Sequence, residues 1–137
     1  GFAKAAEIMK PMMDANFAHL LDISVYAIEK ATEAGAKVNL PEKRAPHILS
    51  ITLPRIKSQT MLNLLSAGGV CVSSGSACSS NAKNRHVSSA LVAFGLSEAD
   101  ADCTIRVSLC KDNTLEDIDT FAELLASGIQ RLVKIKR

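Results

Sequence analysis

The sequence has few large aromatic side chains for its apolar content. It contains no tryptophan, one tyrosine and four phenylalanines, although 47% of its 137 residues are hydrophobic. So high an apolar content excludes a disordered chain. This composition fits a domain that exposes some apolar surface, which another part of a larger protein would cover. Together with a start at Gly1 rather than at methionine, it favours a piece of a larger protein.

Long apolar runs and an excess of one charge are also missing. No run approaches the about 20 apolar residues of a membrane helix, and a signal-peptide pattern is absent. Sixteen basic and fourteen acidic residues leave a net charge of +2, and the basic residues are scattered. Such a balance argues against nucleic acid or an anionic membrane as the main partner. We expect a cytoplasmic protein with no nucleic-acid and no membrane partner.

The four cysteines form no C-x-x-C pair. Zinc ligands usually pair two to four residues apart, so no metal site is predicted. Reduced thiols are the default in a chain without secretory features. Cys71 flanks one predicted strand, and Cys103 and Cys110 bracket the strand over 103–109 on or near its apolar side, which predicts buried, structural thiols.

Hydrophobic periodicity predicts a mixture of helices and strands. A 3.6-residue rhythm over residues 2–34 indicates a helix that Pro11 kinks or divides and Gly35 ends. Further helices are predicted from a Ser58 cap to Gly68, over 85–94, after a Ser97 cap, and after a Thr114 cap. Strands are predicted over 37–40, 47–53, 70–72 and 103–109. In the last of these, apolar residues stand at odd positions and polar ones at even positions. The prediction is one α+β domain over 1–137, a two-layer α/β sandwich with a small, mainly antiparallel sheet covered by helices.

Small polar residues dominate the run from Ser73 to Asn81, which predicts a mobile surface loop. Its cysteine, Cys78, is expected to be exposed. An accessible thiolate is a strong nucleophile, and a mobile loop lets it travel between two sites. A flexible linker with an incidental cysteine explains the loop's chemistry equally well.

Arg106 is the second candidate for a functional role. It lies mid-strand on the polar face, where its fork of donors can clamp a carboxylate. Taken alone, an exposed arginine on the solvated side of a sheet is the better explanation, because charged residues mostly stay exposed.

The run from Val72 to Ser80 closely resembles the catalytic-cysteine loop of group I cysteine desulfurases. These are pyridoxal-phosphate enzymes of the fold-type I, class V aminotransferase superfamily. The resemblance extends over nearly the whole chain, through residues 1–5, 47–51, 86–87, 93–96, 105–109 and 113–119.

This resemblance gives the candidate residues specific roles. Cys78 matches the nucleophile that attacks the sulfur of L-cysteine, leaving an enzyme persulfide and L-alanine. Arg106 matches the arginine that holds the substrate carboxylate. The residues around Cys78 match the hinge and arm of its mobile loop: Ser74, Gly75, Ser76, Ala77, Ser79 and Ser80. The resemblance also implies pyridoxal 5'-phosphate, a homodimer, and a sulfur-acceptor protein in iron–sulfur cluster or thio-cofactor synthesis.

The sequence departs from the family pattern at the cofactor. The family's Schiff-base lysine follows a Ser-x-His motif, and neither Lys83 nor Lys111 has that context, so no cofactor-binding residue is assigned. The resemblance thus implies the C-terminal small domain alone, inactive by itself and with no covalently bound cofactor. We expect the helix over 2–34 and parts of the sheet to expose apolar surface. A selenocysteine lyase, another class V aminotransferase domain, or a non-catalytic interaction domain with this fold remain alternatives.

Overall fold

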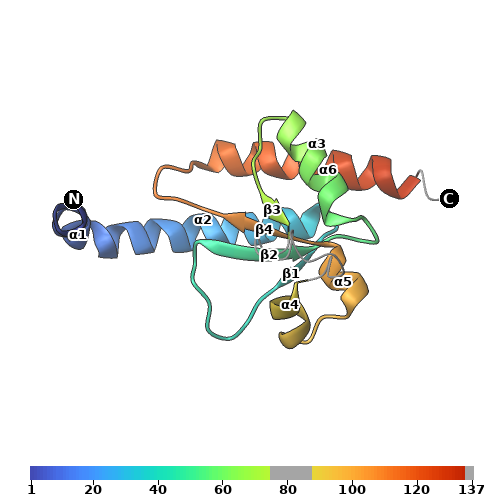
Figure 1. The fold of residues 1–137 in the computed structure, drawn as a ribbon. Helices are drawn as coiled ribbons and strands as arrows, with labels where there is room; N and C mark the ends of the chain where they lie inside the picture. Colours follow the sequence, from blue (N-terminus) through green and yellow to red (C-terminus); the bar gives the residue numbers. More distant parts are fainter. Residues whose placement is uncertain (75–87, 135–137) are drawn as a thin grey trace.

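The computed structural model describes residues 1–74 and 88–134 (Figure 1). Its centre is a four-stranded sheet in the order β1-β2-β4-β3. The strands are β1 (Lys37–Asn39), β2 (Ile48–Thr52), β3 (Ser73–Ser74) and β4 (Thr104–Ser108). Each neighbouring pair is antiparallel, which confirms the α+β class with a mainly antiparallel sheet.

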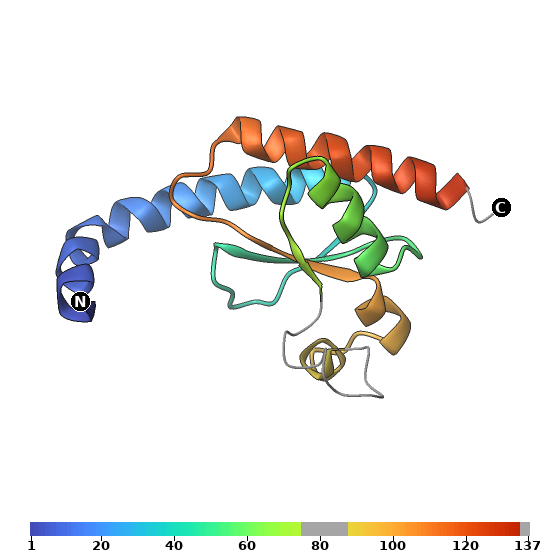
Figure 2. The same ribbon diagram turned by 45° about the horizontal axis from the view of Figure 1, so that its top comes forward.

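The predicted N-terminal helix is divided at Pro11. It consists of α1 (Phe2–Met9), the 3-10 turn η1 (Lys10–Met12) and α2 (Met13–Glu33). Proline lacks the amide hydrogen that a continuous helix needs, so the chain bends there, as Figure 2 shows at the N-terminal end. Gly35, at φ +89°, lets the chain leave α2 and enter β1.

Three helices cover one face of the sheet: α2, α3 (Ser58–Ala67) and α6 (Leu115–Lys134). In Figure 2 α2 and α6 run side by side, and the phenol of Tyr26 donates a 2.7 Å hydrogen bond to Asp119 between them. The hydrophobic core lies between these helices and the sheet. It includes Leu49, Ile51, Ile105 and Val107 from the strands and Met61, Leu65, Phe121 and Leu125 from the helices. This arrangement confirms the sandwich.

The opposite face of the sheet, here called the open face, carries the polar positions of β2 and β4. Two short helices lie beside it, α4 (Ser89–Ala93) and α5 (Glu98–Asp102). The predicted helix over 85–94 is thus present as α4 in its described part. Residues 85–87 lie outside the described residues.

Two of the three predicted side-chain caps are confirmed. The Ser97 hydroxyl accepts from the Asp100 amide at 3.1 Å, and the Thr114 hydroxyl accepts from the Asp117 amide at 3.3 Å. The Ser58 cap was wrong: Lys57 is the N-cap residue, and Ser58 is the first residue of α3.

The third predicted strand is displaced along the chain. Residues 70–72 form no strand, whereas Ser73 and Ser74, predicted to begin the loop, pair with Arg106 and Ile105 as β3. Main-chain pairing with β4 therefore overrides the low strand propensity of serine. The predicted loop residues from Gly75 to Ser80 lie outside the described residues.

The N-terminal helical segment, from α1 well into α2, turns many of its apolar side chains to solvent. All of α1 and η1 is exposed, and α2 buries only Ile23, Ser24, Ala27 and Ala31. The exposed apolar side chains, here called the apolar stripe, are Phe2, Ile8, Met9, Met12, Met13, Phe17, Leu21 and Val25. The expected apolar surface on this segment is thus confirmed. No helix in the described ranges is both long and apolar enough to cross a membrane.

Candidate functional site

Arg106 lies in the middle of β4 with its side chain on the open face. Its neighbours along the strand, Ile105 and Val107, point into the core, so the alternation of β4 directs the guanidinium away from the core. The side chain is exposed. No carboxylate among the described residues forms an ion pair with it.

A row of polar side chains crosses the sheet at Arg106. Asn39 in β1 pairs with Ser50 in β2, Ser50 with Arg106 in β4, and Arg106 with Ser73 in β3. The Asn39 amide donates to Ser50 at 3.1 Å, and Arg106 Nη2 donates to Ser73 Oγ at 3.4 Å. The row thus contains two hydrogen-bonded pairs, which meet where Ser50 lies opposite Arg106.

A hollow of about 220 Å³ opens at this meeting point. Strand residues and α4 line it: Ile48, Ser50, Ser88, Ala90, Leu91, Thr104, Ile105 and Arg106. The walls are mainly apolar, with one cation and a few hydroxyls. A guanidinium that pairs with no carboxylate in the described part of the chain, in a hollow of low polarity, suits a small anion such as a carboxylate.

A second set of hydrogen bonds fixes α5 beside the hollow. The Thr52 and Thr104 hydroxyls are 2.7 Å apart, and the Thr104 hydroxyl donates to the Asp100 carbonyl at 2.7 Å. Asn39 Nδ2 donates to Thr52 at 2.9 Å. Thr52 and Thr104 are buried although they are polar, and these bonds offset the cost of their burial.

The predicted loop around Cys78 is described only at its first two residues, Ser73 and Ser74. Ser74 lies in β3, where its hydroxyl donates to Gln59 of α3 at 3.5 Å. Cys78, Gly75, Ser76, Ala77, Ser79 and Ser80 lie outside the described residues. The structure therefore places Arg106 and the strand before the loop, and does not test the role of Cys78.

The prediction of buried structural thiols was wrong for two cysteines. Cys71 and Cys110 are exposed, and Cys103 is half-buried. Cys110 follows buried Leu109 and so continues the outward-facing even positions of β4. Cys71 is two residues before Ser73, whose partner Arg106 is on the open face. The alternation of β4 carried the signal for Cys110, whereas the side on which Cys71 lies follows from the pairing of β3 with β4.

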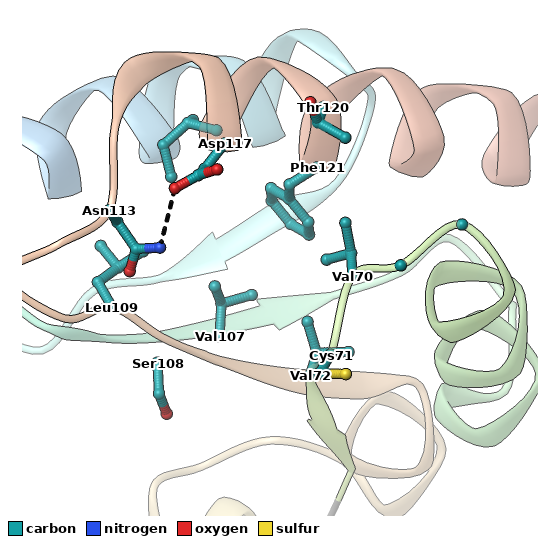
Figure 3. Close-up of a pocket in the computed structure, with 13 residues that line it drawn as sticks. Val70, Cys71, Val72, Val107, Ser108, Leu109, Asn113, Asp117, Thr120 and Phe121 are labelled. Carbon is teal, nitrogen blue, oxygen red and sulfur yellow. Dashed lines mark hydrogen bonds between the residues drawn. The ribbon is translucent and has the colours of Figure 1, made fainter.

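A second pocket, of about 290 Å³, lies between the end of β4 and α6 (Figure 3). Asn113 and Thr114 donate to the Asp117 carboxylate at 3.2 and 3.0 Å. The hydrogen bonds from the Thr114 amide, the larger effect, and from Asn113 lower the pKa of Asp117 below its usual value. These polar groups serve the N-terminal cap of α6, so this pocket offers no comparable donor to an anion.

The residues of the hollow do not form a site for pyridoxal phosphate. Such a site needs a lysine for the Schiff base, and none of the described lysines lines the hollow. Lys111 is exposed and pairs with Asp112. The polar row supplies donors for a substrate anion rather than a cradle for a cofactor.

Comparison with known proteins identifies the family. A family model described as aminotransferase class-V matches residues 1–121. Cysteine desulfurase IscS 1 of Archaeoglobus fulgidus is 33% identical over an alignment of 138 residues. The alignment covers 96% of this chain and 35% of the relative. Cysteine desulfurase IscS of Methanosarcina thermophila is 30% identical over 135 residues, covering 96% and 33%.

Solved structures agree with this match. A NifS-like protein has a TM-score of 0.75 at 29% identity, covering 96% of this chain and 32% of its own. A NifS-like protein from Rickettsia africae, at 24% identity and a TM-score of 0.80, shares the fold. The chain spans about a third of the length of these curated relatives and structures. It belongs to the class-V aminotransferase family.

Proposed function

We propose that this chain is the C-terminal domain of a cysteine desulfurase, in which Arg106 binds the carboxylate of L-cysteine and Cys78 takes the sulfur. The observation that carries the proposal is the position of Arg106. It has no carboxylate partner among the described residues, opens on a hollow, and bonds to Ser73 in β3, with which the predicted loop that contains Cys78 begins.

The proposed transfer balances without an added oxidant or reductant. The Cys78 thiolate attacks the substrate sulfur, so that an S–S bond forms and the C–S bond breaks. The electron pair of the C–S bond remains on the substrate carbon, which takes a proton to give L-alanine. Pyridoxal phosphate bound in the full-length enzyme would supply the electron sink for this cleavage.

The contribution of this chain is to orient the substrate and to carry the product. A guanidinium fixes a carboxylate through paired hydrogen bonds, which holds the rest of the amino acid in one position. A cysteine in a run of small residues can receive sulfur inside a pocket and deliver it outside. The recipient in this proposal is a sulfur-acceptor protein of iron–sulfur cluster or thio-cofactor synthesis.

The remaining features of the proposal concern the whole enzyme. It is a cytoplasmic homodimer, and this chain alone neither binds the cofactor covalently nor turns over cysteine. The relatives that are about three times as long bear the name cysteine desulfurase, and the exposed apolar stripe offers surface for further protein to cover.

The test is sulfide release from L-cysteine under reductant by the full-length enzyme. Cys78→Ala is expected to abolish release, whereas the exposed control Cys71→Ala is expected to retain it. Unchanged sulfide release by Cys78→Ala would contradict the proposed role of Cys78. A parallel assay with selenocysteine separates a desulfurase, active on both, from a lyase that releases selenide alone.

A further inference from the structure

We propose that the Ser50 hydroxyl is a second hydrogen-bond donor to the carboxylate held by Arg106, an inference that rests on the proposed function. Ser50 is the direct cross-strand partner of Arg106. Side chains at such positions have Cβ atoms about 4.5–5.5 Å apart. No hydrogen bond joins these two side chains among the described residues, so both face the hollow as separate groups.

The direction of each proton in the neighbouring network is set by one carbonyl. Asp100 O can only accept, so the single hydroxyl proton of Thr104 goes to it. Thr104 must then accept from Thr52, whose hydroxyl lies 2.7 Å away. Thr52 therefore donates its own proton to Thr104. Toward its remaining neighbour, Asn39, the Thr52 hydroxyl can only accept a hydrogen bond.

The Asn39 side chain therefore turns its NH₂ group, not its oxygen, toward both hydroxyls. One hydrogen goes to Thr52 at 2.9 Å and the other to Ser50 at 3.1 Å. Ser50 is thus an acceptor toward Asn39, and within the described ranges its own hydroxyl proton has no acceptor. A serine has one proton to donate, and here the network leaves it free for an acceptor in the hollow.

The chemical class that fits is a small carboxylate. Ionised carboxylates only accept hydrogen bonds, through two oxygens that can engage two donors at once. Arg106 offers a charged donor from β4 and Ser50 a neutral donor from the paired position in β2, and both side chains line the same hollow. Apolar neighbours Ile48, Ala90 and Leu91 suit a short aliphatic remainder such as that of an amino acid.

The test is a titration of the 137-residue chain with propionate, followed by NMR shifts of the Ser50 amide and the Arg106 Nε–H. Equal concentrations of propionamide and of chloride control for a neutral analogue and for ionic strength. We expect saturable NMR shifts with propionate and none with propionamide or chloride. Ser50→Ala should weaken the affinity by about tenfold, the size of one charge-assisted hydrogen bond. Ser50→Thr, which keeps the hydroxyl, should bind within about threefold of the parent.

The matched control is Ser108→Ala, which removes a hydroxyl from the same strand face two residues from Arg106. It should leave the affinity unchanged, and a native spectrum for every variant shows that the fold is intact. If Arg106→Ala abolishes binding while Ser50→Ala binds as the parent does, the Ser50 role is overturned and the arginine clamp stands. If the parent shows no saturable shift, or Arg106→Ala binds equally well, both are overturned.

Discussion

Arg106 Nη2 donates to Ser73 Oγ across the β3–β4 pairing, at 3.4 Å. This bond connects the proposed carboxylate clamp to β3, which ends four residues before Cys78 in the sequence. The clamp and the first two residues of the predicted loop, Ser73 and Ser74, are therefore parts of one antiparallel pair. Their relative position follows from the register of β3 on β4 and not from a long connection.

Loss of the guanidinium should impair catalysis by the full-length enzyme. We expect Arg106→Ala to lower kcat/KM for L-cysteine. The expected loss of transition-state stabilisation is about 2–3 kcal/mol, which is typical of the removal of a charged hydrogen bond. Arg106→Lys should be intermediate, because lysine keeps the charge but not the fork of donors. Steady-state kinetics measure both. An unaltered kcat/KM in Arg106→Ala refutes the clamp.

The cap of α6 should make part of the stability pH-dependent. The pKa of Asp117 is lowered in the folded state, so its contribution is present above the unfolded pKa of about 3.9 and is lost as pH falls through the folded pKa. Asp117→Asn should therefore lower Tm at about pH 7, with a difference that shrinks at pH values below the folded pKa. Thermal melts at several pH values measure this. A difference that stays constant with pH is incompatible with an ionised cap.

Close packing of α6 on α3 should make Gly128 sensitive to a single added methyl group. A Cβ there would lie 2.9 Å from Met61 Sδ and 3.0 Å from Met61 Cε, and Met61 is fully buried. Alanine favours the helix by about 1 kcal/mol over glycine, whereas overpacking a core costs about 1–3 kcal/mol. We expect Gly128→Ala to be net destabilising in urea unfolding. A gain in stability would show that Met61 moves aside at little cost.

Replacing two phenylalanines by alanine should have very different effects on the free energy of unfolding of the 137-residue chain. Phe121 is 3% exposed, so Phe121→Ala should cost about 3–5 kcal/mol. Phe17, in the apolar stripe, is 57% exposed, so Phe17→Ala should change the free energy of unfolding by less than about 0.5 kcal/mol. In the full-length enzyme Phe17→Ala should become costly. An equally small effect there would mean that the stripe stays uncovered.

Local patterns were enough to predict most helices and β4. The alternation of residues 103–109 predicted the buried positions Ile105, Val107 and Leu109, because one face of the strand meets the core. Thr104 departs from the pattern. It is polar and buried, since Thr52 and the Asp100 carbonyl supply its hydrogen bonds.

The neighbours of Arg106 could not be predicted in the same way. Ser50 and Ser73 lie far from it in sequence, and only the register of three strands brings them together. Strand register depends on which strands pair, which the pattern of one strand does not contain. The short β3 was missed for a related reason, because its pairing with β4 is a tertiary interaction that serine propensity does not reveal.

The most direct test of the central claim is the location of the transferred sulfur. After one turnover of L-cysteine by the full-length enzyme without reductant, mass spectrometry of the proteolytic peptides should find one added sulfur atom on Cys78. The exposed thiols of Cys71 and Cys110 serve as internal controls and should be unmodified. Added sulfur on either of them with none on Cys78, or alanine formed with no sulfur on any cysteine, would contradict the account.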